Sequence, residues 1–129
     1  MKNQKGLTLI ELMITVVIII VLAGIAFPAY QNQVTKARRA DAHTMLSNGA
    51  LEMERCRSLN ATFTGCTVTP NSEFDNYTVT VSINGGGTYY QLIATPKGPQ
   101  VGDTECGKLT LDSRGSKGSD TGVEKCWPD

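Results

Sequence analysis

The chain has few of the side chains on which most enzymes depend. It holds one histidine and one tryptophan among 129 residues, and aromatic residues make up only 6% of it. No nucleophile-elbow or phosphate-loop spacing occurs. A zinc site is also disfavoured, because no two cysteines have the Cys-x-x-Cys spacing and His43 lies far in sequence from the later cysteines. We therefore predict no catalytic residue, no metal, no cofactor and no enzymatic activity.

The chain also lacks net charge, since 12 Lys and Arg residues balance 12 Asp and Glu residues. This balance gives no overall attraction to nucleic acid, anionic membrane or acidic substrate. The apolar residues are concentrated near the N-terminus, and after Phe27 the chain is polar and rich in Gly, Thr and Ser. The sequence therefore predicts one small domain with a limited core, joined to an apolar N-terminal segment.

Four cysteines, Cys56, Cys66, Cys106 and Cys126, lie outside the apolar segment. An even number in a small exported domain indicates two disulfides formed in an oxidising compartment. Three pairings are possible, and proximity in sequence favours Cys56–Cys66 and Cys106–Cys126. Each bond would contribute about 3 kcal/mol by the loop-entropy model.

The apolar segment, residues 7–27, is long enough to cross a membrane. As a helix it would span about 30 Å, the thickness of a bilayer core. Lys2 and Lys5 precede it, which favours a cytoplasmic start. A secretory signal peptide has the same basic start and apolar core, and that alternative stays open, but it does not explain Glu11. A carboxylate at mid-membrane costs up to roughly 3 kcal/mol, so Glu11 is a candidate functional group.

The stretch KGLTLIELM, residues 5–13, resembles the class III signal of type IV prepilins, although that family usually has Phe where this chain has Leu7. The resemblance implies that a prepilin peptidase removes the leader after Gly6 and that Leu7 is then N-methylated. It also implies that the subunit first sits in the bacterial inner membrane. An assembly platform there then packs it, together with other pilin subunits, into an extracellular pilus, or fimbrium. Such filaments serve adhesion, twitching motility or DNA uptake.

Two features of this segment would act in assembly. Cleavage creates an amine on Leu7, four residues before Glu11 and on the same helix face, and the two charges attract strongly in a low dielectric. The partner amine is the chain's own or, as the resemblance implies, a neighbouring subunit's; the alternative is that Glu11 snorkels to water. Pro28 cannot donate a hydrogen bond to Gly24, so a kink or local unwinding is expected there, and in the family this region can melt on assembly.

We predict three parts: a leader, 1–6; a transmembrane or filament-core helix, 7–28; and a soluble head, 29–129. Residues 29–59 read as an amphipathic helix. Its expected buried side comprises Tyr30, Val34, Ala37, Met45, Met53 and Cys56. Its expected solvated side comprises Lys36, Arg38, Arg39, Asp41, Glu52 and Glu54.

The rest of the head reads as an antiparallel sheet. Residues 77–83 alternate strictly between apolar and polar, which indicates a strand with one buried face. A glycine-rich turn at 84–87 leads to a partner strand over 88–95, which the prolines at 96–99 end. Residues 108–112 read as a third strand. The prediction is an α+β fold, with the long helix packed on three or four antiparallel strands, as in type IV pilins.

The C-terminal run 106–115, together with Cys126 and Trp127, resembles the tail of PilE-type minor pilins. This resemblance implies that the disulfide-bounded end is a surface loop, the D-region, used for subunit contact and partner recognition. A type II secretion pseudopilin is an alternative, and so is a membrane protein that never assembles.

Some PilE-like pilins are DNA receptors for natural transformation, and four basic residues of the tail are candidates for contacts with DNA phosphates. They are Lys108, Arg114, Lys117 and Lys125. Acidic residues interleave with them, so a mixed solvated surface is the alternative. We expect Trp127 to pack against the disulfide rather than to stack on a base, and His43 to be a surface residue.

Overall fold

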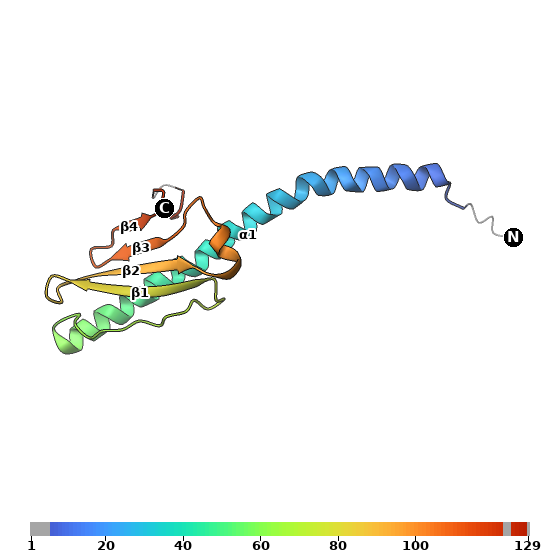
Figure 1. The fold of residues 1–129 in the computed structure, drawn as a ribbon. Coiled ribbons are helices and arrows are strands. Elements are labelled where there is room, and N and C mark those ends of the chain that lie inside the picture. Colours follow the sequence, from blue (N-terminus) through green and yellow to red (C-terminus); the bar gives the residue numbers. More distant parts are fainter. Residues whose placement is uncertain (1–5, 123–124, 129) are drawn as a thin grey trace. The chain divides into compact units, whose positions relative to one another are not determined.

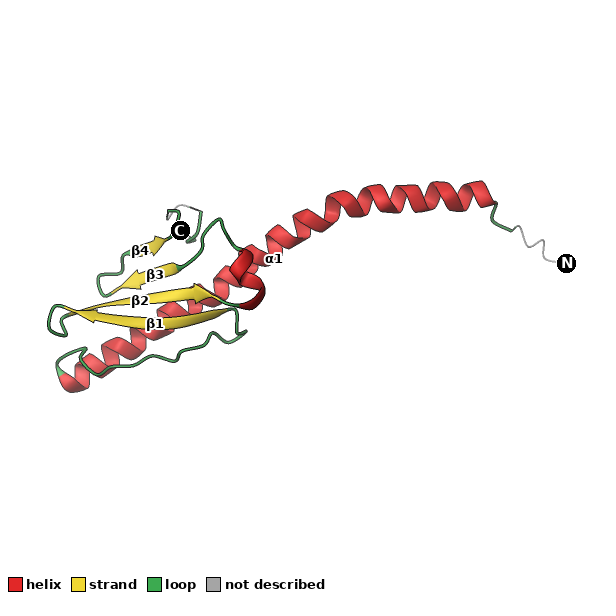
Figure 2. Ribbon diagram, viewed as in Figure 1, coloured by secondary structure: helices red, strands yellow, loops and turns green. Residues whose placement is uncertain are grey.

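The computed structural model describes residues 6–122 and 125–128 of the chain. Its elements are the helix α1 (Leu9–Asn60), the strands β1 (Tyr77–Asn84), β2 (Tyr89–Pro96), β3 (Leu109–Asp112) and β4 (Lys117–Ser119), and the short 3-10 helix η1 (Gly98–Gly102) (Figures 1 and 2). The strands form one antiparallel sheet in the order β1-β2-β3-β4. The predicted α+β fold is confirmed. Contacts divide the chain into two compact units, Met1–Val34 and Thr35–Asp129.

The first hairpin follows the alternation seen in the sequence. β1 and β2 pair from Tyr77 opposite Pro96 to Asn84 opposite Tyr89, and Tyr77 and Val79 are buried. The turn between them needs glycine, because Gly87 has a φ of 87° and an added Cβ there would collide with the hydroxyls of the Thr62–Thr64 region. The two predicted strands and the turn are therefore confirmed.

The second hairpin was predicted only in part. β3 coincides with the third expected strand, whereas β4 has three residues, too few to show alternation in sequence. Asp112 holds the turn between them, since its Oδ1 accepts hydrogen bonds from the backbone N–H groups of Arg114 and Ser116 at 2.9 and 2.8 Å. This arrangement makes a short edge strand possible without an apolar pattern.

The C-terminal part of α1 packs on this sheet around one core. Gly49 weakens the helix by about 1 kcal/mol relative to alanine. Its close packing against the sheet explains why a glycine occupies this position. A Cβ at Gly49 would lie 3.1 Å from Leu92 Cδ1, closer than side chains normally approach. The core cluster comprises Ala42, Met45, Leu46, Met53, Phe63, Cys66, Tyr77, Val79, Tyr90, Leu92, Ala94, Cys106, Leu109, Cys126 and Trp127.

Two disulfides, Cys56–Cys66 and Cys106–Cys126, close the end of α1 and the C-terminal loop. This is the pairing that proximity in sequence favoured. The bonds enclose short loops, 10 and 20 residues in sequence separation, so each one restrains its own end of the domain.

The expected solvated side of α1 was wrong at two positions, and the expected buried side was wrong at two others. Arg39 and Asp41 are buried, with 4% and 9% of their surface exposed. Tyr30 and Ala37 are exposed. The helical face that meets the head therefore carries charge, which apolar periodicity cannot reveal.

Arg39 is buried because acidic partners from the loop after η1 neutralise it. Its Nε and Nη2 donate to the two carboxylate oxygens of Asp103 at 2.7 Å, and Nη2 also donates to Glu105 at 2.7 Å. Burial alone would raise the pKa of Asp103, but the hydrogen bonds and charge of Arg39 outweigh it, so the pKa of Asp103 lies below its usual value. The same partners raise the pKa of Arg39, mainly through the hydrogen bond with Asp103. A buried, hydrogen-bonded ion pair thus joins α1 to the loop.

Candidate functional site

The start of α1 positions Glu11. Among the predicted leader residues, only Gly6 lies in the part of the chain that the structure describes, and α1 begins three residues later, at Leu9. The Glu11 backbone N–H donates to Thr8 Oγ1 at 3.3 Å, and the Thr8 N–H reaches Glu11 Oε2 at 3.5 Å. This reciprocal arrangement is a capping box, and its Thr-x-x-Glu signature could have been read from the sequence. Thr8 is thus a positioning residue that the sequence reasoning missed.

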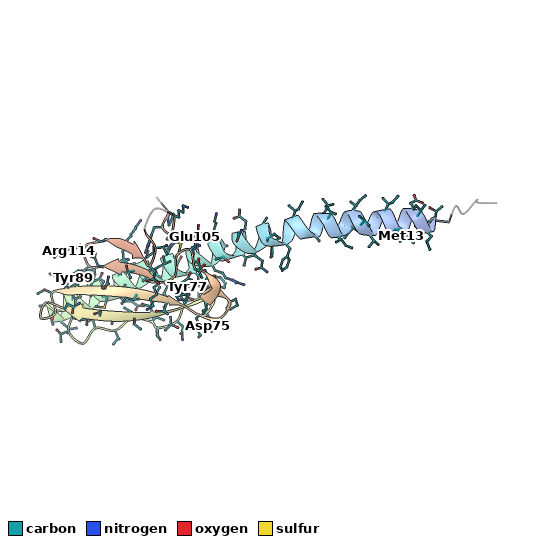
Figure 3. The ribbon with its side chains drawn as sticks, turned by 45° about the horizontal axis from the view of Figure 1, so that its top comes forward. Met13, Asp75, Tyr77, Tyr89, Glu105 and Arg114 are labelled. Carbon is teal, nitrogen blue, oxygen red and sulfur yellow. A yellow bond between two sulfur atoms is a disulfide. The ribbon has the colours of Figure 1, made fainter. Side chains whose placement is uncertain are left out.

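The apolar run of α1 is uncovered. Its large side chains from Leu9 to Phe27 are exposed, among them Met13, labelled in Figure 3. By length and composition α1 could cross a membrane, with a mean hydropathy of 2.9 over its most apolar stretch of 18 residues. So much apolar surface requires lipid or other helices around it. Glu11 is the only charged side chain between Gly6 and Thr35.

Of the predicted kink or local unwinding around Gly24 and Pro28, the structure shows no unwinding. Residues 9–60 are helical without a break, although Pro28 lies inside the helix. A Cβ at Gly24 would meet nothing within 4 Å, so the protein's own packing does not require a glycine there. Proline removes only one backbone donor, and the helix continues around it.

The C-terminal disulfide loop is fastened to α1 by His43, which is half-buried and not the surface residue that we expected. His43 Nε2 donates to the Cys126 carbonyl at 2.8 Å, and its ring stacks on Trp127 with centroids 4.6 Å apart. Trp127 Nε1 in turn donates to the Gly118 carbonyl in β4 at 2.8 Å. Burial lowers the pKa of His43, with Lys117 and Arg39 adding to the effect. The neutral ring therefore serves as packing for the tail.

The structure brings together only some of the four predicted DNA-contact residues. Lys117 Nζ lies 5.4 Å from the Trp127 ring centroid, and Lys125 borders an open pocket of about 250 Å³ beside the same ring. Lys36 also lines that pocket. Its spacing from Arg39 and His43 places the three residues on one helix face, so the sequence could have indicated that Lys36 belongs to this group.

Arg114 and Lys108 lie elsewhere on the second hairpin. The Arg114 guanidinium sits at the β3–β4 turn, 5.7 Å from the Tyr89 ring, and Figure 3 shows the two side by side. The Lys108 backbone N–H, at the other end of β3, donates to Asp120. Trp127 itself is only 8% exposed and belongs to the core cluster with Cys106 and Cys126. A base could not stack on its face without a rearrangement.

One group of potential metal ligands exists within the described residues, namely Asp103, Glu105 and Cys106. It does not fit a metal ion. The Cys106 sulfur is in a disulfide, and Arg39 already binds both carboxylates.

Two family models together match residues 1–110 of the chain. The prokaryotic N-terminal methylation motif matches residues 1–27, and the model described as "Type IV minor pilin ComP, DNA uptake sequence receptor" matches residues 28–110. The chain belongs to the type IV pilins. It is 32% identical to the fimbrial protein EcpC of Eikenella corrodens over 123 residues, which cover 90% of this chain and 78% of that protein.

Other relatives match shorter stretches of the chain. A fimbrial protein of Moraxella nonliquefaciens is 53% identical over 45 residues, 35% of this chain. That match spans 29% of the Moraxella nonliquefaciens protein. The match to the type IV major alpha-pilin of Moraxella bovis spans 31% of that protein.

Solved structures agree with the fold. A type IV pilin from Shewanella oneidensis has a TM-score of 0.59 and 27% identity, over 74% of this chain and 99% of that one. The minor pilin PilV of Neisseria meningitidis, at 24% identity, shares the fold with a TM-score of 0.56 over 71% of this chain and 91% of that one. The chain is accordingly a structural subunit of a type IV pilus, anchored in the inner membrane by its apolar helix and assembled with other pilins into an extracellular filament.

Proposed function

We propose that this pilin is cut after Gly6 by a prepilin peptidase, N-methylated on Leu7, and inserted by an inner-membrane assembly platform into a filament whose helix register Glu11 sets. The observation that carries the proposal is the isolation of Glu11, one carboxylate in an uncovered apolar helix. Among the described residues its only observed donor is the Thr8 backbone N–H, a neutral group that does not compensate the negative charge. The amine created at Leu7 would supply the missing cation, in the same subunit or in a neighbour.

The leader, 1–6, and the boundary between filament-core helix, 7–28, and head, 29–129, belong to the same proposal. The compact head unit begins at Thr35, so residues 29–34 would connect the two as helix. Gly24 and Pro28 would be the place where α1 yields during assembly, because Pro28 removes one of its hydrogen bonds. Since the family consists of structural subunits, we assign the chain no catalytic role.

Replacing Gly6 by leucine is expected to keep the leader attached. Gly6 lies just before α1 with no atom within 4 Å of a Cβ built there, so the substitution should disturb processing and not folding. Mass spectrometry of the membrane-bound protein should show a mature terminus at Leu7 in the wild type and an uncut chain in Gly6→Leu. Substituting Gly24, further along the apolar part of α1, by leucine is the matched control and should leave the cut unchanged. A mature terminus after Ala26 or Ala29 would refute the proposal.

A second candidate function is DNA binding during uptake. The family model described as a DNA uptake sequence receptor covers residues 28–110. Lys117 and Lys125 lie beyond that match. Lys36 and Lys125 line the pocket beside Trp127, and Lys117, in β4, lies over the Trp127 ring. Such a cationic group suits backbone phosphates. Lys108 and Arg114 would contribute from the two ends of β3.

The double variant Lys117→Ala, Lys125→Ala is expected to weaken binding of a double-stranded DNA fragment in a mobility-shift assay with the detergent-solubilised chain. If each lysine meets one phosphate, the slope of log affinity against log salt should fall by about 1.8. Lys97→Ala is the control, because Lys97 pairs with Asp75 at the far end of the first hairpin, at 2.7 Å. Equal affinity of the double variant and the wild type would remove this site from consideration.

A further inference from the structure

The dipeptide Asn-Gly occurs in this chain in two different structural settings. Asn48-Gly49 lies within α1, and Asn84-Gly85 lies where β1 ends and the turn to β2 begins (Figure 1). In such a pair the glycine has no side chain to shield its backbone nitrogen, and this nitrogen can attack the side-chain amide of the asparagine before it. The attack requires a backbone that is free to bring the two groups together. The two sites therefore separate the effect of the fold from that of the sequence.

Both reacting groups of the Asn84-Gly85 pair are accessible. Asn84 and Gly85 are exposed, and the Gly85 N–H donates a hydrogen bond to no residue that the structure describes. The Asn84 amide is held only by a long contact, from its Nδ2 to Ser82 Oγ at 3.5 Å. That distance is beyond the usual range of a hydrogen bond, so the amide can turn toward the Gly85 nitrogen.

The backbone at this position can also rearrange. Asn84 is the last residue of the β1–β2 ladder, opposite Tyr89, and the end of a ladder opens more readily than its middle. Gly85 and Gly86 follow it with φ values of 61° and 65°, a region that only glycine enters at no steric cost. The nearest firm anchor is Gly87, whose carbonyl accepts from the Phe63 N–H at 2.9 Å. The segment between Asn84 and that anchor therefore has the freedom that the attack needs.

The fold protects Asn48-Gly49 from the same reaction. Asn48 is exposed as Asn84 is, so accessibility of the side chain does not distinguish the two sites. Gly49, however, is buried in an unbroken helix, where its N–H belongs to the ladder of hydrogen bonds. A Cβ built on Gly49 would lie 3.1 Å from Leu92 Cδ1, so the sheet covers this part of the backbone closely. An attack by the Gly49 nitrogen would have to break both the helix and this packing.

The asparagines of the head that precede other residues are restrained as well. The N–H groups that follow Asn60, Asn71 and Asn76 all donate hydrogen bonds. They are those of Ala61, to the Arg57 carbonyl at 2.7 Å, Ser72, to the Tyr77 carbonyl at 3.1 Å, and Tyr77, to Ser72 Oγ at 3.0 Å. Among the asparagines of the head, Asn84 is thus the one followed by an N–H group without a partner in the described residues.

We propose that Asn84 is a site of spontaneous deamidation, which makes the tip of the first hairpin negatively charged as the subunit ages. The Gly85 nitrogen loses its proton and forms a bond to Asn84 Cγ, while the bond from Cγ to Nδ2 breaks and ammonia leaves. The product is a cyclic succinimide. Water then adds to either of its carbonyls and opens the ring to aspartate or isoaspartate. The net change converts an amide and water into a carboxylate and ammonium, with no oxidant and no enzyme.

The products would alter the contact between the hairpin and the loop after α1. The chain has no net charge, so each deamidation leaves it with an excess of one negative charge. Isoaspartate also lengthens the backbone between residues 84 and 85. The carbonyl of Gly87, close behind, accepts from the Phe63 N–H and from the Thr62 hydroxyl at 3.3 Å. Lengthening the turn would therefore disturb the loop that the Cys56–Cys66 bond closes.

The test is to incubate the full chain in detergent micelles and to follow both Asn-Gly sites by peptide mapping with mass spectrometry. Mildly alkaline buffer favours loss of the proton from the attacking nitrogen. We expect Asn84 to convert at least about ten-fold faster than Asn48 in the folded protein. In guanidinium chloride with the disulfides reduced, the two rates should become similar, because the helix no longer protects Asn48. Equal rates in the folded protein, or an Asn84 that stays intact, would overturn the proposal.

Asn84→Gln is the matched variant. It keeps the amide at an exposed position, but the added methylene group makes ring closure slower. On isoelectric focusing, the acidic species that accumulates in the wild type should be lost in Asn84→Gln, and Asn84→Asp should migrate with that species from the start. Accumulation of the acidic species in Asn84→Gln at the wild-type rate would place the reaction at another residue and would also overturn the proposal.

Discussion

Glu11→Val is expected to leave the subunit in the membrane while surface filaments fall by at least about ten-fold. The carboxylate is the only charge in the apolar part of α1, and its removal favours residence in lipid. It also removes the attraction to an amine at Leu7, which in a low dielectric readily exceeds the 1.4 kcal/mol of a ten-fold effect. Counting filaments by electron microscopy, beside the membrane level of the subunit, measures both outcomes.

Glu11→Gln separates the charge from the helix cap. Glutamine can still complete the capping box with Thr8, so α1 should begin as it does in the wild type. Only the ion pair is lost, and filaments should again be few. Thr8→Ala is the complementary variant, because it weakens the cap by about 1 kcal/mol and retains the carboxylate. Normal filaments from Glu11→Val would show that the glutamate only snorkels, and a subunit missing from the membrane would show a role in insertion.

Arg39→Ala should destabilise the head by about 3–5 kcal/mol, a large share of the 5–15 kcal/mol typical of a whole domain. The side chains of Arg39 and Asp103 are 5% and 1% exposed, so the substitution leaves a buried carboxylate without its cation. Urea unfolding of the full chain in micelles, followed by the fluorescence of Trp127 in the head, reports the change. Arg55→Ala, at an exposed position of the same helix, should change stability by less than about 0.5 kcal/mol.

Acid distinguishes this ion pair from simple packing. The folded-state pKa of Asp103 lies below its usual value, so the pair stabilises the head at neutral pH and the contribution disappears as pH falls through that pKa. Arg39→Ala should therefore flatten the loss of stability in acid. The double variant Arg39→Met, Asp103→Leu should recover most of the stability, because it leaves no buried charge unpaired; Glu105, the other partner of Arg39, is 49% exposed and can be solvated by water. If Arg39→Ala unfolds at the wild-type urea concentration, the pair contributes nothing.

Local patterns in the sequence were sufficient for much of the fold. The alternation over residues 77–83 identified β1, and the glycines at 84–87 placed its turn, because both signals lie within a few consecutive residues. The stretch KGLTLIELM indicated the family by itself. The Thr8–Glu11 cap was equally local, and a search for its signature would have found it.

The interior of the head could not be predicted in this way. Arg39 read as solvated because its partner Asp103 is 64 residues away, and only the folded chain brings them together. His43 read as a surface residue for the same reason, since Cys126 and Trp127 reach it from the other end of the sequence. Helical periodicity sorts residues by polarity and contains no information on such distant pairs.

The position of the Arg39 ion pair also has a mechanical consequence. α1 runs unbroken into the head unit, which begins at Thr35, so a pull along the helix is transmitted to the head within its first residues. Arg39 is there, bound through short charged contacts to a loop that the Cys106–Cys126 bond closes on its far side. Load would thus be shared between the helix and a covalently closed loop, and peeling the helix away would require several bonds to break together. A subunit built in this way resists shear where tension first enters it.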